Sequence, residues 1–211
     1  PSNTVYPGFK DYKQLQFGWE DGDQWTPAEC DVSIRPGWFY HEKEDSKVKT
    51  VEDLCNLYYK SVGHNATMLL NFPVDKDGLI HPIDSANAVN FHKKIRQELS
   101  VNLLKGITPK VDSQQGKHTG KNITDGQYDT FWASKKKKDA YIEFQLGKPK
   151  SITRLMLQEY IPLGQRVKAF SIYYRQGKNW VRLDPKEETT TIGYKRILRF
   201  DKITTSGIRI V

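Results

Sequence analysis

The stretch ATMLLNFPV, residues 66–74, decides the fold of the first half of this chain. It is a short, continuously apolar run, which is typical of a strand buried on both faces in a parallel sheet. A helix is predicted just before it, because Thr50 and Asp53 have the spacing of a capping box and Leu54 and Leu57 follow at helical spacing. The apolar run is therefore expected to follow a helix.

The segments around this pair extend the pattern in both directions. After the turn DKDG (75–78), a second helix is predicted, with Asp84 or Ser85 as its cap. Before the pair, SIRPGWFYH (33–41) is predicted to be a strand with a Pro-Gly break. This order indicates an α/β fold, but two or three strands and two helices cannot close a barrel. We therefore expect the first half to be part of a larger α/β unit.

The second half follows a period of two instead. YIEFQL (141–146) and FSIYYR (170–175) alternate apolar and polar side chains, as expected for strands with one buried face. The segments ITRLML, NWVRL, KRILRF and GIRIV continue the alternation, and turns are predicted at LGKPK, RQGKN and TTSG. This spacing of strands and turns favours an antiparallel β-sandwich.

Charge changes at the same place as the periodicity. The chain has 211 residues, with 33 Lys and Arg against 25 Asp and Glu, which gives a net charge of +8. Residues 1–104 hold 11 of the bases and 15 of the acids, a net charge of −4, whereas residues 105–211 hold 22 and 10, a net charge of +12. With a Gly and a Pro in KGITPK (105–110), the sequence predicts two domains, 1–104 and 105–211.

Composition excludes several classes of protein. No apolar run is long enough to span a membrane, and two cysteines cannot staple a disulfide-rich miniprotein. The basic residues are scattered along alternating strands, and the run Lys135–Lys138 is expected to be a solvated loop. We therefore do not expect nucleic acid as a partner.

Longer motifs in the first half carry a family resemblance. WTPAECDVSIRPGWFYH (25–41) and VKTVEDLCNLYYKSVGHNATMLLNFPVDKDGLI (48–80) closely resemble glycoside hydrolase family 29, the α-L-fucosidases, in the branch that acts on α-1,3/1,4-fucosylated oligosaccharides. The resemblance implies that residues 1–104 are the C-terminal portion of a (β/α)₈ barrel. It also implies a fucosylated oligosaccharide as substrate and no required cofactor.

The second half resembles the galactose-binding-like β-sandwich, a jelly roll of the discoidin or coagulation-factor type C, that follows the barrel in many of these enzymes. The segments that carry this resemblance are NITDGQYDTFWAS (122–134), AYIEFQLGKP (140–149), LQEYIPLGQRVKAFSIYY (157–174) and TTIGYKRI (190–197). LGQRV and TIGYKR, in this order, favour a fucosidase over a generic sandwich. The alternative is a non-catalytic carbohydrate-binding sandwich with an appended barrel fragment.

The resemblance implies a retaining mechanism with two carboxyl groups. One Asp attacks the anomeric carbon, and a second acid protonates the leaving oxygen and later activates water. No segment here matches the motif of the nucleophile. We therefore expect the upstream half of the same barrel to supply it, and the 211-residue chain alone to be inactive. Enzymes that trim glycans are usually exported, so the resemblance implies a periplasmic or extracellular location.

Trp38 is the first candidate for substrate binding. In the family, the Trp of a matching element packs against the apolar face and methyl group of fucose, which an indole ring covers well. The alternative is a core Trp between Phe39 and Tyr40. Glu29 is the carboxylate expected to face the same pocket, with Arg35 as its partner; the alternative is a structural Glu–Arg pair.

Other candidates surround these residues. Glu29 and Glu20 are the acid/base candidates within the chain, although the family places this group just upstream. Trp25, in the acidic and aromatic loop GWEDGDQW (18–25), is predicted to line a subsite for the aglycone sugar, or else to belong to a solvated lid. His41 can reach the pocket, with a hydrogen-bonded structural histidine as the alternative.

A metal site is predicted only in the sandwich. Asp125 and Asp129, in TDGQYDTFW (124–132), resemble the ligands of a structural Ca²⁺ site that backbone carbonyls complete. The alternative is a plain Asp-Gly turn.

Overall fold

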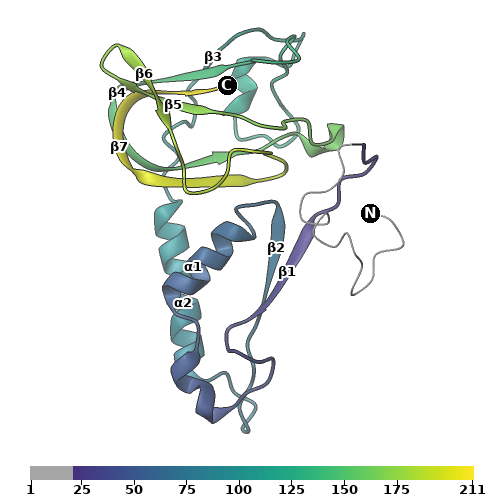
Figure 1. Cartoon of the computed structure of the whole chain (residues 1–211), viewed down its shortest axis with the longest axis vertical. Coiled ribbons are helices and arrows are strands. Elements are labelled where there is room, and N and C mark those ends of the chain that lie inside the picture. The colour runs from purple at the N-terminus through teal and green to yellow at the C-terminus, as the bar shows by residue number, and fades with distance from the viewer. Residues whose placement is uncertain (1–20) are drawn as a thin grey trace.

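A computed structural model describes residues 21–211 of the chain. Two strand–helix units come first, and a curled antiparallel sheet follows them (Figure 1). The strand–helix units form the lower part of the molecule in this view, and the curled sheet forms the upper part. The change of periodicity along the sequence thus matches a change of architecture, while the division at residue 104 stays a prediction.

The described residues of the first part form five elements. They are β1 (Ala28–Ser33), the 3₁₀ helix Glu42–Lys47, α1 (Val51–Lys60), β2 (Ala66–Asn71) and α2 (Pro82–Glu98). β1 and β2 pair in parallel, and their carboxyl ends meet where Ser33 lies opposite Asn71. This is a βαβ unit with a second helix after it, as the order of predicted elements indicates.

The start of α1 confirms the predicted capping box. The Asp53 backbone N–H donates to Thr50 Oγ1 at 3.2 Å, and the Thr50 N–H donates to Asp53 Oδ2 at 3.0 Å. These bonds satisfy two backbone donors that the helix itself cannot satisfy. Leu54 then lies fully buried on the face that meets the strands.

Two local predictions in this part are wrong. The strand predicted over 33–41 ends at Ser33, because Pro36 lacks a backbone donor and the chain bends from Ile34 onward to carry the Arg35 side chain inward. The cap of α2 is His81, whose Nδ1 accepts from the Ile83 N–H at 3.4 Å. The Asp84 carboxylate is not free to cap the helix, because Arg35 binds it.

The second strand, β2, has two different faces. Leu70 packs against the helices, whereas the neighbouring Leu69 is 52% exposed. Alternation places Glu29, Asp31 and Ser33 of the paired strand on the same side as Leu69. Within the described residues only the helix-facing side is covered, so burial on both faces stays a prediction.

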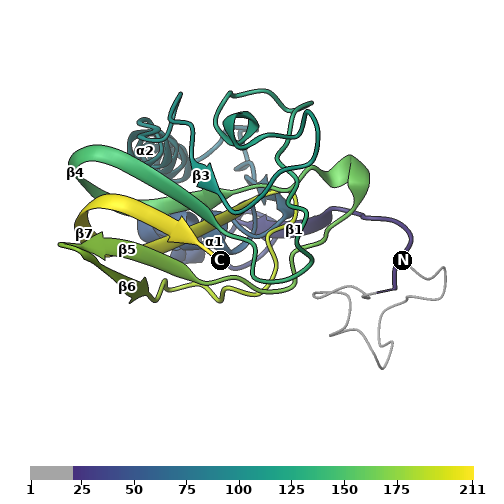
Figure 2. The same cartoon turned by 90° about the horizontal axis from the view of Figure 1, so that it is seen from above.

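The second part is a five-stranded antiparallel sheet in the order β3-β4-β7-β5-β6. Its strands are β3 (Lys110–Val111), β4 (Ile142–Leu157), β5 (Ile172–Gln176), β6 (Asn179–Leu183) and β7 (Arg196–Ile210). β4 and β7 are long and strongly curved, so that the sheet curls around its own core (Figures 1 and 2). Phe144, Ile172 and Leu198 belong to that core. This arrangement fits the predicted β-sandwich.

Two predicted turns lie inside long strands. Gln145 pairs with Gly207 and Lys150 with Thr205, so residues 146–149 of β4 bulge opposite one residue of β7. The stretches LGKPK and TTSG therefore face each other across a bulge, which bends both strands without ending them. The turn at RQGKN is confirmed: it joins β5 to β6, with Gly177 at a φ of 61°.

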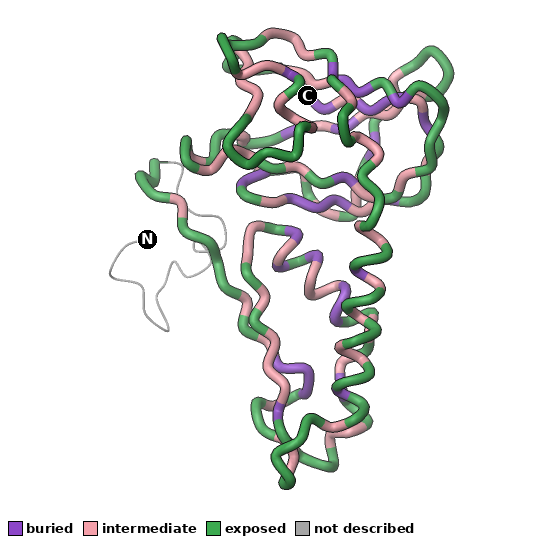
Figure 3. Tube along the Cα trace, turned by 180° about the vertical axis from the view of Figure 1, so that it is seen from behind, coloured by how far each residue is buried: buried purple, intermediate pink, exposed green. Residues whose placement is uncertain are grey.

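The two parts meet through a shared apolar cluster. Ile197 of β7 packs with Cys55, Tyr59 and Ile95 of the helices. Buried residues accordingly lie in the helices and in the sheet where the two parts approach each other (Figure 3). Arg154 of β4 adds polar contacts to the same interface.

That polar contact is a hydrogen-bonded triad. Tyr59 Oη donates to Glu98 Oε2 at 2.5 Å, Arg154 Nε donates to Tyr59 Oη at 3.2 Å, and Arg154 Nη2 lies 3.0 Å from Glu98 Oε2. Burial and the hydrogen bond to Glu98 raise the pKa of Tyr59 to about 12, so the phenol stays neutral and keeps donating.

Candidate functional site

The candidate site lies at the carboxyl edge of β1 and β2, the edge where ligands bind in α/β folds. Asn71, the last residue of β2, donates from Nδ2 both to Ser33 Oγ at 3.1 Å and to the Trp38 carbonyl at 3.1 Å. This one amide therefore ties the ends of both strands to the loop that carries Trp38.

The Trp38 side chain is not part of a core in this chain. It is 52% exposed, and the neighbouring Phe39 is 78% exposed. Asn71 fixes the backbone of Trp38, while the indole ring stays exposed. Such a ring offers a flat apolar surface to a ligand. The alternative of a core Trp flanked by Phe39 and Tyr40 does not describe the arrangement of the residues present.

Arg35 holds the same loop from inside. Its fully buried guanidinium donates to both Asp84 oxygens, at 2.8 and 2.9 Å, and to Asp45 Oδ1 at 2.8 Å. Burial acts to lower the pKa of Arg35, but the hydrogen bonds with Asp84 and Asp45 outweigh it and the pKa rises. The group is therefore a permanent cation that clamps the Trp38 loop to α2.

This geometry corrects the predicted Glu29–Arg35 pair. The partners of Arg35 are Asp84 and Asp45, because α2 brings a carboxylate to the carboxyl edge of the strands while Glu29 lies near the amino end of β1. Glu29 is exposed and lies four residues before Ser33 on the same strand, a separation of about 13 Å at the usual rise per residue. The structure therefore does not bring Glu29 to Trp38.

Trp25 also lies at the amino end of β1. Its ring contacts Tyr194 of the curled sheet, with centroids 6.2 Å apart. The Trp38 loop follows the opposite end of the strand, as the course of β1 in Figure 1 makes clear. The structure thus places Trp25 beside the second part of the chain, away from the candidate pocket that its predicted subsite required.

Two histidines lie at the carboxyl edge. His41 is exposed at the start of the 3₁₀ helix, where its carbonyl accepts from the Glu44 N–H at 2.9 Å. The ring of His81, which the sequence did not single out, contacts that of Tyr40 in a tilted arrangement, with centroids 5.9 Å apart, and His81 Nε2 lies 3.6 Å from Asp45 Oδ2. Tyr40 in turn lies under the Arg35 guanidinium, 4.6 Å from its carbon. The loops after β1 and β2 are thus packed against each other.

Several residues of this site gave no clear signal in the sequence. Asn71 ends an apolar run, Asp84 has the appearance of a helix cap, and Asp45 lies in a polar stretch. Their partners are between 10 and 49 residues away along the chain. The acid/base candidate Glu20 lies outside the described residues.

The predicted calcium loop is closed by hydrogen bonds within the chain. Asp125 Oδ1 accepts from the Gln127 N–H at 2.8 Å, and Asp125 Oδ2 accepts from Thr130 Oγ1 at 2.7 Å. These bonds lower the pKa of Asp125, the Thr130 bond most. Asp129 is exposed nearby. Over residues 21–211, no group of three His, Cys, Asp or Glu side chains has the arrangement of a metal site; calcium, which also uses backbone oxygens, stays a prediction.

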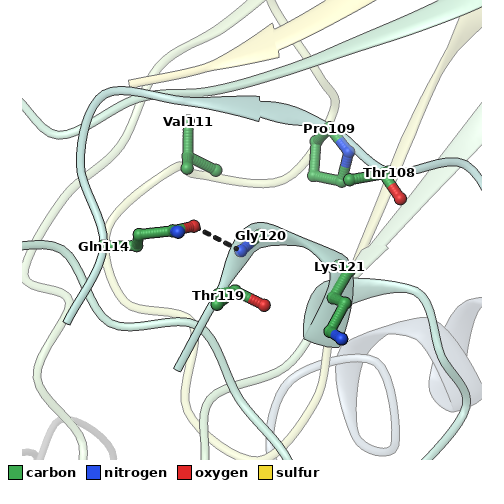
Figure 4. A pocket seen from close by; sticks show the side chains of 7 residues that line it. All are labelled: Thr108, Pro109, Val111, Gln114, Thr119, Gly120 and Lys121. Atoms are coloured by element: carbon green, nitrogen blue, oxygen red, sulfur yellow. Dashed lines mark hydrogen bonds between the residues drawn. The ribbon is translucent and has the colours of Figure 1, made fainter. Parts of the chain in front are cut away.

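A shallow hollow of about 330 Å³ lies in the second part, between β3 and the 3₁₀ helix Gly120–Ile123. Figure 4 shows its lining, where Gln114 Oε1 accepts from the Gly120 N–H at 3.4 Å. Lys121 is the one charged side chain among the residues drawn. The hollow belongs to the curled sheet and is separate from the Trp38 loop.

Among the helices in the described part of the chain, none combines the length and apolar character needed to cross a membrane.

Comparison with known proteins covers both parts of the chain. Residues 108–211 match the F5/8 type C domain. Two curated plant proteins also match: α-L-fucosidase 1 of Arabidopsis thaliana is 34% identical over 88% of this chain, and a relative from Oryza sativa subsp. japonica is 37% identical over 90% of it. The chain spans 37% of the length of each plant relative.

Solved structures agree with these matches. A GH29 fucosidase of Ruminococcus gnavus, solved in complex with fucose, superposes with a TM-score of 0.82 at 36% identity, over 92% of this chain and 39% of that one. The crystal structure of SpGH29 gives a TM-score of 0.86 at 32% identity, over 93% of this chain and 43% of that one. Through its strand–helix units and its F5/8 type C domain, the chain is thus similar to the C-terminal part of the α-L-fucosidases of glycoside hydrolase family 29.

Proposed function

We propose that the protein of which this chain is a part is a retaining α-L-fucosidase that releases L-fucose from fucosylated oligosaccharides or glycoconjugates. The observation that carries the proposal is the exposed Trp38, held at the carboxyl edge of two parallel strands by Asn71. A 6-deoxy sugar presents C–H groups and a methyl group that such an indole ring covers without needing polar partners. Similarity to fucosidases over both parts of the chain supports the same substrate.

The strand–helix units are proposed to be the C-terminal portion of a (β/α)₈ barrel, within residues 1–104. Their parallel pairing and alternating order support this, and so does the uncovered side of β2, where Leu69 is 52% exposed. The upstream half of the same barrel would cover that side. Glu29 and Asp31 of β1 would then point toward the barrel interior.

The chemistry divides between this chain and the upstream half. An upstream Asp would attack the anomeric carbon of fucose and form a glycosyl-enzyme, while a second acid protonates the leaving oxygen and later deprotonates the attacking water. In this chain, Trp38 covers the apolar face of the sugar and Asn71 holds the Trp38 backbone. Arg35 keeps the loop in place from below, because its donors bind Asp84 and Asp45.

Fucose release by the complete protein tests the proposal. The substrate is an α-1,3/1,4-fucosylated oligosaccharide, and released L-fucose is measured over time. We expect release by the complete protein and none by residues 1–211 alone, since no segment of this chain matches the nucleophile motif. A folded complete protein that releases no fucose from any fucosylated oligosaccharide would overturn the proposal.

A second candidate is a carbohydrate-binding role for the curled sheet. The F5/8 type C match and the hollow beside Lys121 favour this reading. Calorimetry of the chain with fucose- and galactose-containing glycans tests it: saturable heat that the variant Lys121→Ala weakens would support binding at the hollow. No heat at millimolar glycan would exclude it.

Export is proposed from the family resemblance. Enzymes that trim host or dietary glycans meet their substrates outside the cytoplasm, so a periplasmic or extracellular location is expected. Fractionation of the source cells, followed by detection of the complete protein with an antibody, tests this. Recovery in the cytoplasm alone would contradict it.

A further inference from the structure

The segment just before β2 reaches across to the second part of the chain. Asn65 Oδ1 accepts from the Lys195 N–H at 2.8 Å, and the Asn65 N–H donates to the Lys195 carbonyl at 3.0 Å. Two residues earlier, the Gly63 carbonyl accepts from the Ile197 N–H at 2.8 Å. The chain that enters β2 is therefore hydrogen-bonded to the chain that enters β7.

Gly193 makes this approach sterically possible. Its φ is +65°, and a Cβ at this position would lie 2.6 Å from both the oxygen and the nitrogen of the Asn65 side-chain amide. Asn65 itself has a φ of +67°, a left-handed conformation that Asn and Asp tolerate better than most residues. The contact thus depends on glycine at one position and on Asn or Asp at the other.

Glu159 completes the arrangement on the far side of Gly193. Its Oε2 accepts from the Gly193 N–H at 2.6 Å, while Oε1 accepts from the backbone N–H groups of Arg166 and Val167 at 2.7 and 2.8 Å. The Glu159 N–H also donates to the Gly193 carbonyl at 2.8 Å. One carboxylate therefore binds three backbone donors from two loops.

The two loops are the stretches LGQRV (163–167) and TIGYKR (191–196), which distinguish this sandwich from a generic one in the sequence. Glu159 joins these two loops to each other, and Lys195 of the second loop binds Asn65 of the first part of the chain.

We propose that Asn65, Glu159 and Gly193 are positioning residues that form a latch between the curled sheet and β2. The latch sets one end of this six-residue strand, and Asn71 at its other end holds the Trp38 loop. The curled sheet is then a fixed part of the sugar-binding unit, and not a mobile module on a linker. The inference rests on the proposed fucosidase function, because its consequence is the placement of Trp38.

Three variants at Asn65 separate its side-chain hydrogen bond with Lys195 from its tolerance of a positive φ. Asn65→Asp keeps both the acceptor for Lys195 and the tolerance of a positive φ, Asn65→Gly keeps only the conformation, and Asn65→Ala keeps neither. Glu159→Gln replaces one acceptor oxygen by a donor and cannot bind all three N–H groups. Asn122→Ala is the matched control, because Asn122 holds the Lys117 and Phe131 carbonyls within the sheet part alone.

The measurement is KM and kcat for fucose release by the complete enzyme, well below its melting temperature. Trp38 contacts the sugar before and during the reaction, so its misplacement raises KM more than it lowers kcat. We expect about a ten-fold rise in KM for Asn65→Ala and Glu159→Gln, a smaller rise for Asn65→Gly, and a change within about two-fold for Asn65→Asp and Asn122→Ala. Equal KM values in Asn65→Ala and Asn122→Ala would overturn the latch.

Hydrogen exchange gives a second readout that does not need activity. In the complete protein, the amides of β2 should lose protection in Asn65→Ala and Glu159→Gln and keep it in Asn122→Ala. Unchanged protection of β2 in both latch variants would overturn the inference. A wild-type enzyme that releases no fucose would overturn the proposed function instead, while the exchange result would still decide whether the latch exists.

Discussion

Arg35 and Asp84 form a fully buried, two-point ion pair between residues 49 positions apart in the sequence. The pair joins the loop after β1 to the first turn of α2, and Asp45 occupies a third donor of the same guanidinium. Because all three groups come from loops or helix starts at the carboxyl edge of the strands, the pair shapes the surface that carries Trp38.

Replacing Asp84 by Asn should destabilise the complete protein by about 3–5 kcal/mol, because it leaves the buried Arg35 charge without its main partner. The free energy of unfolding in guanidinium chloride measures this. Lys94→Ala is the control, since the Lys94–Glu52 pair is exposed and should contribute less than about 1 kcal/mol. If both variants lose only a similar, small part of the free energy of unfolding, Asp84 does not stabilise the buried Arg35 charge as predicted.

Replacing Trp38 by Ala should lower kcat/KM for fucose release about 100-fold, since burying one face of an indole against a sugar is worth about 2–3 kcal/mol. Steady-state kinetics of the complete enzyme test this. Phe39→Ala, next to it and 78% exposed, is the control and should change kcat/KM less. A near-normal kcat/KM in Trp38→Ala would show that Trp38 does not bind the sugar.

The Glu98 carboxylate predicts a pH dependence of stability. Burial acts to raise its pKa, but hydrogen bonds from Tyr59 and Arg154 outweigh it, and the pKa is lowered from its usual 4.5. A lowered pKa in the folded state stabilises the protein above pH 4.5, and this stability is lost as the pH falls through the folded value. Glu98→Gln should therefore be less stable than wild type at pH 7 and approach it in acid. A pH-independent difference would contradict the ionised triad.

The Asp125 loop predicts the response to a chelator. Gln127 and Thr130 already bind both Asp125 oxygens, so EDTA should shift the melting temperature of the complete protein by less than about 1 °C. Thr130→Ala, which frees one oxygen, should lower the melting temperature instead. A fall with EDTA that added calcium restores would establish the metal site predicted from the sequence.

Local patterns were enough to predict much of the fold. Thr50 and Asp53 identified the start of α1, because a capping box involves only neighbours in sequence. The alternation in NWVRL predicted β6 within its observed bounds. The prediction of turns at LGKPK and TTSG was wrong because of a long-range contact. The two stretches face each other across a bulge, and the pairing of β4 with β7 keeps both inside the strands.

At the candidate site, the contrast between local sequence patterns and long-range contacts is larger. The sequence by itself determined that Trp38 lies next to a Pro-Gly break, and that the chain resembles family 29 over both halves. It did not determine that the strand ends at Ser33, before Trp38. It could not determine that Arg35 binds Asp84 and not Glu29, or that Trp25 lies beside Tyr194. Those relationships follow from which end of β1 each residue occupies and from where α2 begins. Tertiary packing alone decides this, because a buried charge takes whichever counter-charge the fold brings within hydrogen-bonding distance.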